Sequence, residues 1–141
     1  AYMHPGEQNL YDMVGLQAQK YGLRPPRQCK IERELADSQR LQLGSYEFHC
    51  LLTPGHSPAS ISFYIPLAKR VIAGDTLFRR AIGRTDLEGG NEATLLKSIR
   101  TKLLTLPPDT MVFPGHGAET TIHDETKYNP FLTAFAKTRR A

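Results

Sequence analysis

The stretch CLLTPGHSPAS (residues 50–60) decides the fold, because an apolar run stops there at a Pro-Gly pair and leaves His56 first in the following loop. The chain repeats this arrangement in MVFPGHGAE (residues 111–119), where the histidine is His116. Between the two, IAGDT (residues 72–76) ends another apolar run at a glycine followed by an aspartate. Polar residues that follow several strand ends are typical of a site built at one edge of a sheet.

Outward from these turns, the chain mixes two hydrophobic periods. Alternating or short apolar runs predict strands, and apolar residues three and four apart predict helices. The expected strands are residues 1–4 (as the end of a strand), 41–52 with a Gly-Ser turn inside, 60–66, 69–75 and 109–115. The expected helices are residues 5–22, 91–106 and 120–129. This mixture predicts an α/β layered domain.

Composition and charge narrow the class of protein. The 141 residues suit one domain, and 40% hydrophobic with 23% charged residues is a globular composition whose apolar runs are too short for a membrane helix. The net charge of +4 is scattered, which argues against a nucleic-acid partner but is compatible with an anionic small molecule. Two cysteines without a paired motif, and a start unlike a signal peptide, predict a reduced, cytoplasmic protein with no membrane partner.

His56, Asp75 and His116 are the candidate site residues. Two imidazoles and a carboxylate are ligands that a divalent metal such as zinc accepts, and the neighbouring glycines allow sharp turns without crowding. Taken singly, each has a simpler explanation, since a histidine in a Pro-Gly turn is usually a loop residue and Asp75 can close an Asx-turn. Because all three follow strand ends, a shared metal site is the favoured interpretation.

Four ordered motifs carry a resemblance to a known family: TPGHSPASISFY, VIAGDTLF, AIGRTDLEGG, and VFPGHGAETTIHDE followed by NPFL. Together they resemble the metallo-β-lactamase-fold hydrolases, and most closely their glyoxalase II-like (hydroxyacylglutathione hydrolase-like) branch. The resemblance covers essentially the whole chain. It implies an αββα sandwich with a two-metal site in a groove at one edge of the sheets.

The resemblance also implies roles for the candidate residues. His56 matches the histidine that completes the three-histidine set of the first metal, Asp75 matches the carboxylate that bridges both metals, and His116 matches the last histidine on the second metal. The implied cofactor is a pair of zinc ions, with iron or manganese as alternatives. The implied reaction is hydrolysis of a small-molecule thioester, such as an acylglutathione, by a metal-activated hydroxide, with Asp75 as the catalytic residue.

The chain departs from the family at its first metal motif, H-x-H-x-D-H, which is absent; the other histidines, His4, His49 and His123, form no H-x-H. That motif supplies four of the family's seven ligands. Residues 1–141 are therefore expected to be a single partial domain without the first strands, a fragment that holds metal poorly and is inactive alone. Its uncovered sheet is expected to pair in a homo-oligomer or with a complementing N-terminal segment.

Further residues and functions have alternatives that the sequence leaves open. Arg84, in AIGRTDLEGGN (residues 81–91), can bind a substrate carboxylate or simply pair with Asp86 in a surface turn. Cys50 alternates with core positions and is expected to be a buried thiol rather than a nucleophile. For the whole chain, a non-catalytic partner-binding or structural module is the main alternative to a hydrolase. Hydrolysis of β-lactams shares the site chemistry and ranks below both.

Overall fold

The computed structural model describes residues 1–133; the last eight residues of the predicted domain, 134–141, lie outside the described part. The strands are β1 (Tyr2–Met3), β2 (Arg33–Glu34), β3 (Arg40–Leu43), β4 (Tyr46–Leu52), β5 (Ile61–Ile65), β6 (Arg70–Gly74), β7 (Leu77–Phe78), β8 (Ala81–Ile82), β9 (Met111–Pro114) and β10 (Thr120–Thr121). The helices are α1 (Gln8–Asp12), α2 (Val14–Lys20), α3 (Glu92–Ser98) and α4 (Ile122–Tyr128), with short turns η1 (Pro5–Glu7), η2 (Pro66–Ala68) and the π-helical η3 (Ile99–Leu103). None of the helices in the described part is long and apolar enough to cross a lipid bilayer.

Six strands form the main sheet, in the order β10-β9-β6-β5-β4-β3. Pairing is antiparallel from β3 through β6, whereas β6 and β9 pair in parallel. As a result β4, β6 and β9 run in the same direction, and their carboxyl ends lie at the same edge of the sheet. These are the three strands whose ends carry the Pro-Gly-His and Gly-Asp turns.

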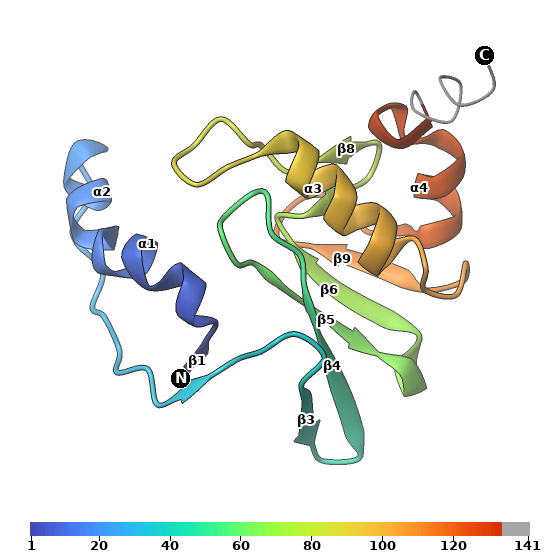
Figure 1. The fold of residues 1–141 in the computed structure, drawn as a ribbon, viewed down its shortest axis with the longest axis horizontal. Coiled ribbons are helices and arrows are strands. Elements are labelled where there is room, and N and C mark those ends of the chain that lie inside the picture. The colour runs from blue at the N-terminus through green and yellow to red at the C-terminus, as the bar shows by residue number, and fades with distance from the viewer. Residues whose placement is uncertain (134–141) are drawn as a thin grey trace.

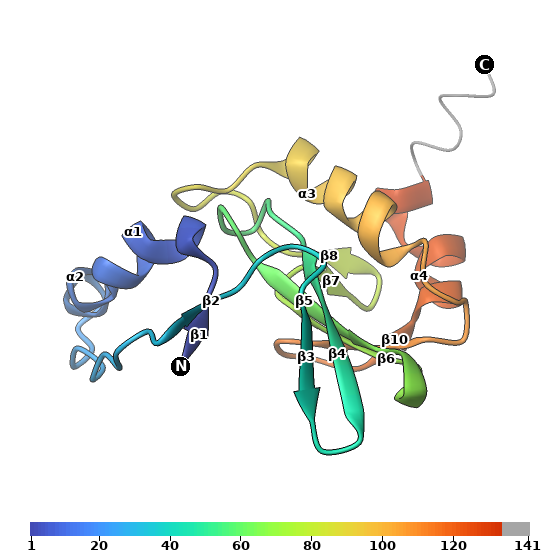
Figure 2. The same cartoon turned by 60° about the horizontal axis from the view of Figure 1, so that its bottom comes forward.

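Helices cover one face of this sheet and build the core there (Figures 1 and 2). Helix α3 begins as the sequence predicts, because the Asn91 side chain accepts a hydrogen bond from the backbone N–H of Thr94 at 2.8 Å. The apolar stripe of α3 and η3 meets β6 and β9 across the core. The buried residues of this cluster are Val71, Ala73, Leu77, Leu95, Leu96, Ile99, Leu103, Val112, Ile122 and Leu132.

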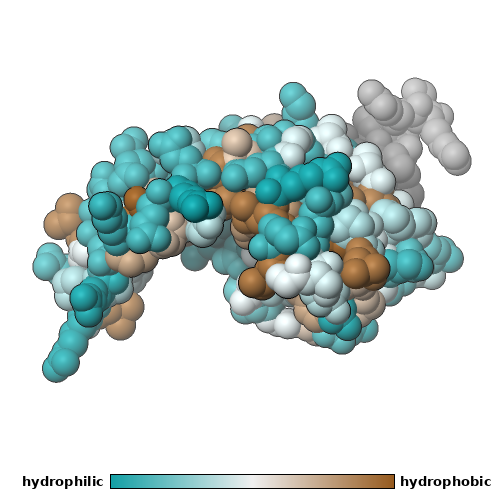
Figure 3. All heavy atoms as spheres, turned by 90° about the horizontal axis from the view of Figure 1, so that it is seen from below, coloured by the Kyte–Doolittle hydropathy of each residue, from teal (hydrophilic) through white to brown (hydrophobic). Residues whose placement is uncertain are grey.

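The opposite face of the sheet is apolar as well, and we call it the open face: Phe48, Phe63, Ile72 and Phe113. Strand register places Phe63, Ile72 and Phe113 side by side on β5, β6 and β9. Ile72 is 44% exposed although it lies mid-sheet. The other sheets within residues 1–133 are the two-residue pairs β1–β2 and β7–β8. Figure 3 shows the molecule hollowed beside the N-terminal residues, with hydrophobic surface along the sheet side of the hollow.

The N-terminal lobe, residues 1–34, holds a parallel pair of two-residue strands, β1 and β2, beside the helical segment (Figure 1). The sequence predicts one helix over residues 5–22. The structure divides it into η1, α1 and α2, with an interruption at Met13, whose φ and ψ are −85° and −4°. Gly15, a poor helix former, lies in the next turn. The lobe contacts the loop after β4 through Glu7, whose carboxylate accepts a hydrogen bond from Ser57 Oγ at 2.7 Å.

The sequence prediction misses the β7–β8 hairpin and also β10, whose two residues open the stretch expected as a helix over 120–129. Residues 77–78 and 81–82 form the β7–β8 hairpin directly after Asp75, and the second strand takes the first two residues of what the sequence presents as a loop. Strands of two residues are too short to show an alternating pattern, so periodicity cannot detect them.

Cys50 is a buried thiol, as the sequence predicts, with no exposed surface, whereas Cys29 is exposed. Burial, and next the charge of Asp37, raise the pKa of the Cys50 thiol above its usual value. A raised pKa means less thiolate, the reactive form, at neutral pH. We therefore expect a thiol-modifying reagent at pH 8 to label Cys29 alone in the native chain and both cysteines after denaturation. Rapid labelling of native Cys50, located by peptide mass, would contradict this placement.

Candidate metal centre

The three candidate ligands follow the ends of three strands that run in the same direction. His56 lies in the loop after β4, Asp75 directly follows β6, and His116 lies two residues beyond β9. The sheet therefore brings residues that are far apart in the sequence to one edge, which is where sites on sheets of this kind usually form.

Asp75 stands between the two histidines, with a different carboxylate oxygen toward each. His56 Nε2 lies 3.6 Å from Asp75 Oδ2, and His116 Nε2 lies 4.0 Å from Asp75 Oδ1. A carboxylate in this position has one oxygen to offer on each side. The tertiary structure thus brings together the three residues that the strand-end pattern singles out.

A backbone carbonyl sets the orientation of the His56 ring. His56 Nδ1 lies 2.9 Å from the carbonyl oxygen of Arg84. Because a carbonyl oxygen only accepts, Nδ1 carries the hydrogen and Nε2 of the neutral ring keeps its lone pair on the side of Asp75. Metal-binding histidines are typically held in this way, with the second ring nitrogen donating to a carbonyl or carboxylate.

Two glycines allow the backbone to pack closely around Asp75. A Cβ atom on Gly115 would overlap Asp75 Oδ1, and one on Gly83 would overlap the carbonyl oxygen of Asp75. The Gly115 N–H also donates to the carbonyl oxygen of Gly74 at 2.9 Å. A side chain at Gly115 would therefore displace the Asp75 carboxylate from its position between the two histidines.

His116 is held by an aromatic neighbour rather than by burial. Its side chain is 77% exposed, and its ring centroid lies 4.6 Å from that of Phe78, with the two planes tilted by 38°. Phe78 belongs to the β7–β8 hairpin. The position of this hairpin therefore bears directly on the His116 ring.

The three residues open into a cavity of about 410 Å³ at the edge of the sheet. Its walls combine the candidate ligands with side chains from the hairpin and from the loop after it. The lining residues that matter for the argument are His56, Asp75, Phe78, Arg79, Arg84 and His116. Neither Arg79 nor Phe78 is indicated as a site residue by the sequence motifs described above. Their position after the Gly-Asp turn is the one signal in the sequence that could have indicated them.

The types of donor at the site suit a divalent metal, but the donors are too few to fill the coordination sphere of one metal ion. Each oxygen of Asp75 faces one imidazole, which gives two donors on either side of the carboxylate. Zinc sites are usually four-coordinate, with three or four protein ligands. Accordingly, within residues 1–133 no group of three or more His, Cys, Asp or Glu side chains could hold a metal ion by itself.

Arg84 pairs with Asp86 in a surface turn, which is one of the two alternatives that the sequence leaves open. Its Nε and Nη2 atoms donate to the two carboxylate oxygens of Asp86, both at 2.8 Å. These hydrogen bonds from Arg84 lower the pKa of Asp86 to about 2, so the pair stays ionised at neutral pH. Arg84 still lines the cavity, and its role in substrate binding stays a prediction.

Comparison with known proteins gives relatives over most of the chain. The chain is 54% identical over 96 residues to a probable metallo-hydrolase, YqgX, of Bacillus subtilis, covering 68% of this chain and 46% of that protein. It is 40% identical over 131 residues to the hydroxyacylglutathione hydrolase GloC of Haemophilus influenzae, covering 89% of this chain and 59% of that protein. The chain thus spans about half of the length of these relatives.

Solved structures agree with these relatives. The B3 metallo-beta-lactamase BLEG-1 has a TM-score of 0.84 and 40% identity, with 94% of this chain and 64% of that chain covered. TTHA1623, solved in a di-iron-bound form, has a TM-score of 0.85 and 43% identity, with 93% of this chain and 64% of that chain covered.

The fold of the described residues is thus the mixed α/β fold of these metallo-beta-lactamase neighbours. A model of the metallo-beta-lactamase superfamily matches residues 23–116, from the connector in front of β2 to the last candidate ligand. Motifs, fold and relatives agree, and this chain belongs to the metallo-beta-lactamase superfamily.

Proposed function

We propose that this chain supplies the carboxylate-bridged half of a two-metal hydrolase that cleaves thioesters of the acylglutathione type. The observation that carries the proposal is the placement of Asp75, with one carboxylate oxygen toward His56 and the other toward His116. The likeness to a hydroxyacylglutathione hydrolase over 89% of the chain supports the choice of substrate.

In this proposal His56 and Asp75 would help to hold the first metal, and Asp75 and His116 would help to hold the second. Zinc suits the nitrogen and oxygen donors, and iron is the alternative, as in the di-iron form of TTHA1623. When bound, such metals polarise a carbonyl and lower the pKa of a bound water. The chain's own contribution is to fix the donors. Asp75 sets the separation of the two positions, and the Arg84 carbonyl holds the His56 ring.

Substrate recognition is assigned to the arginines at the cavity wall. An acylglutathione carries carboxylates, which guanidinium groups bind bidentately. Arg79 and Arg84 both line the cavity next to the candidate ligands. Asp86 holds Arg84 from the side of Nε and Nη2, so a substrate carboxylate would compete with Asp86 for this guanidinium.

We propose further that the remaining ligands come from an N-terminal segment that carries the H-x-H-x-D-H motif and packs on the open face. A groove of about 580 Å³ lies there between the N-terminal lobe and the sheet, bounded by Tyr2, Phe48 and Phe63. Covering Phe63 and the half-exposed Ile72 would remove apolar surface from water, at roughly 25 cal/mol for each Å² buried. The alternative is that a second copy of the chain covers the same face in a homo-oligomer. In both cases we propose that the protein acts in the cytoplasm.

The experiment compares the 141-residue chain with a longer form in which a segment carrying the H-x-H-x-D-H motif precedes it. Metal content and hydrolysis of S-lactoylglutathione are measured on both. We expect the short chain to hold less than one metal ion and to be inactive. We expect the longer form to hold about two and to lose its activity when a chelator removes them.

Other outcomes would decide against parts of the proposal. A longer form that holds two metals but cleaves a β-lactam and no thioester would replace the substrate class. A longer form that neither binds metal nor hydrolyses either substrate would favour the non-catalytic module. Activity of the short chain as a dimer would replace the complementing segment by a second copy.

A further inference from the structure

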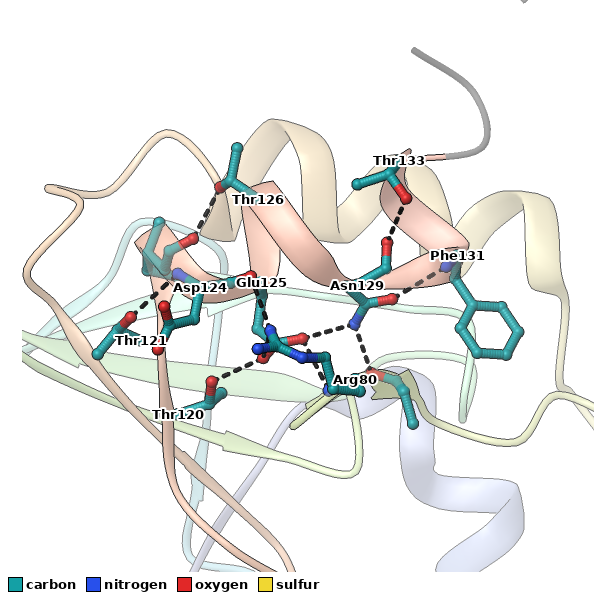
Figure 4. Close-up of polar contacts among 11 residues, drawn as sticks. Arg80, Thr120, Thr121, Asp124, Glu125, Thr126, Asn129, Phe131 and Thr133 are labelled. Carbon is teal, nitrogen blue, oxygen red and sulfur yellow. Dashed lines mark hydrogen bonds and ion pairs between the residues drawn. The ribbon is translucent and has the colours of Figure 1, made fainter. Parts of the chain in front are cut away.

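Glu125, in α4, is a carboxylate with no exposed surface that lies outside the proposed ligand set. A buried charge is costly unless it is paired and hydrogen-bonded. Glu125 meets this need with donors from three segments, as Figure 4 shows: Thr120 Oγ1 at 2.6 Å, Asn129 Nδ2 at 2.8 Å and the backbone N–H of Arg80 at 2.9 Å. The Arg80 guanidinium adds an ion pair at 3.6 Å.

The contacts of Glu125 act on the turn between β7 and β8. Arg80, in this turn, has a φ of +61°, a left-handed conformation that costs free energy for a residue with a side chain. Glu125 holds the N–H of this strained residue, and Arg80 Nη1 also donates to the carbonyl oxygen of Asp124 at 3.0 Å. The Asn129 side chain holds the next residue, since its Nδ2 donates to the carbonyl oxygen of Ala81 at 3.1 Å. The last residue of the turn and the first residue of β8 are therefore fastened to α4 and to the residue that ends it.

The same turn forms one wall of the candidate metal centre. Ala81 pairs with Phe78 across the hairpin, and the Phe78 ring packs against the ring of His116. The carbonyl of Thr76 accepts the N–H of Gly83, which closes the hairpin next to Asp75. A shift of the turn would therefore move Phe78 and change the support of the exposed His116 ring.

We propose that Glu125, assisted by Asn129, is a positioning residue: it fixes the β7–β8 turn and, through Phe78, the orientation of His116. The inference rests on the proposed function for its catalytic meaning, since His116 needs a fixed orientation because it binds a metal there. It also explains the NPFL motif, because Asn129 of that motif fastens the turn to the end of α4.

Two variants at one position separate this role from simple packing. Glu125→Gln keeps a carbonyl oxygen for Arg80 and Asn129, and its NH2 group can donate to the Thr120 hydroxyl, which can reverse its role. Glu125→Met has a similar size but no strong acceptor. Thr126→Ala is the matched control on α4, because the hydrogen bond that Thr126 Oγ1 makes among residues 1–133 goes to the carbonyl of Ile122 within the same helix.

The readouts are the amide exchange rate of Arg80 and the ring-proton chemical shifts of His116, measured by NMR on the isotope-labelled chain. Phe78→Leu supplies the His116 shifts expected when the aromatic contact is lost. We expect Glu125→Met to raise Arg80 exchange by about tenfold or more and to move the His116 shifts toward those of Phe78→Leu. Glu125→Gln and Thr126→Ala are expected to keep both readouts near those of the unmodified chain. In the metal-loaded longer form, kcat of Glu125→Met falls by about tenfold with little change in KM, and Glu125→Gln restores it.

Unchanged His116 shifts in folded Glu125→Met would overturn the proposal, as would faster exchange that is equally large in β3 and β4, because Glu125 would then only stabilise the fold. If Glu125→Met does not fold, Asn129→Ala decides, since it keeps the bonds of Glu125 to Arg80 and Thr120. It should move the His116 shifts in the same direction, and unchanged shifts would overturn the proposal. The NMR readouts need neither metal nor substrate, so an inactive unmodified protein would count against the proposed function and not against the positioning.

Discussion

Asp75→Asn is expected to remove metal from the complete site and to lower kcat by about a thousandfold or more. Asp75 faces both histidines, so its loss weakens both metal positions together. A bound metal supplies several kcal/mol of transition-state stabilisation, and each 1.36 kcal/mol corresponds to a tenfold change in rate. Metal content by elemental analysis and thioester hydrolysis on the same sample of the longer form provide the measurement.

The control for Asp75→Asn is Asp109→Asn. Asp109 is an exposed carboxylate paired with Lys69 at 2.6 Å, and it lies outside the cavity. We expect this variant to keep about two metal ions and full activity. If Asp75→Asn retained both metals and most of its activity, Asp75 would not bridge them, and the assignment of the site would be wrong.

Gly55→Ala is expected to lower the free energy of unfolding by about 3 kcal/mol or more, which is a large part of the stability of a small domain. Gly55 has a φ of +130°, and a Cβ atom there would overlap the backbone of Leu95. Leu95 is fully buried in α3, so the helix cannot move away without opening the core. Denaturant unfolding of the 141-residue chain, followed by circular dichroism, measures the loss.

Gly44→Ala separates the overlap from the effect of backbone conformation. Gly44 also has a positive φ, +59°, but no atom lies within 4 Å of the position of its Cβ. It should cost about 1–2 kcal/mol, the usual penalty for a left-handed residue with a side chain. If the two variants lost equal free energy of unfolding, backbone conformation alone would require glycine at Gly55. Leu95 would then move enough to accommodate the added Cβ atom.

Local patterns in the sequence predict much of the fold because they depend on near neighbours. The alternation in residues 41–52 becomes β3 and β4 around the expected turn, and Asn91 caps α3 where the sequence places it. Interruption of the first helix at Met13 is not visible in the apolar spacing, which continues at helical intervals through residues 5–22.

The candidate site likewise has a part that the sequence predicts and a part that only the fold shows. The strand-end pattern indicates His56, Asp75 and His116, and the sheet brings them together because β4, β6 and β9 share a direction. The sequence leaves two choices open for Arg84; the structure shows the ion pair with Asp86, and substrate binding by Arg84 stays a prediction. Metal binding by these residues stays a prediction, with the ligand count of the described residues as its main constraint.

By itself the sequence determined the order of the longer strands and of the helical segments, the glycines beside the candidate ligands and the family resemblance, since these depend on residues a few positions apart. Tertiary structure alone decided that Phe78 supports His116 and that buried Glu125 holds the turn at Arg80. Arg80 and Glu125 are 45 positions apart, and no local period links them. Their contact follows from how α4 and the β7–β8 hairpin pack together, because a carboxylate becomes a fixed support only where folding removes water and supplies its donors.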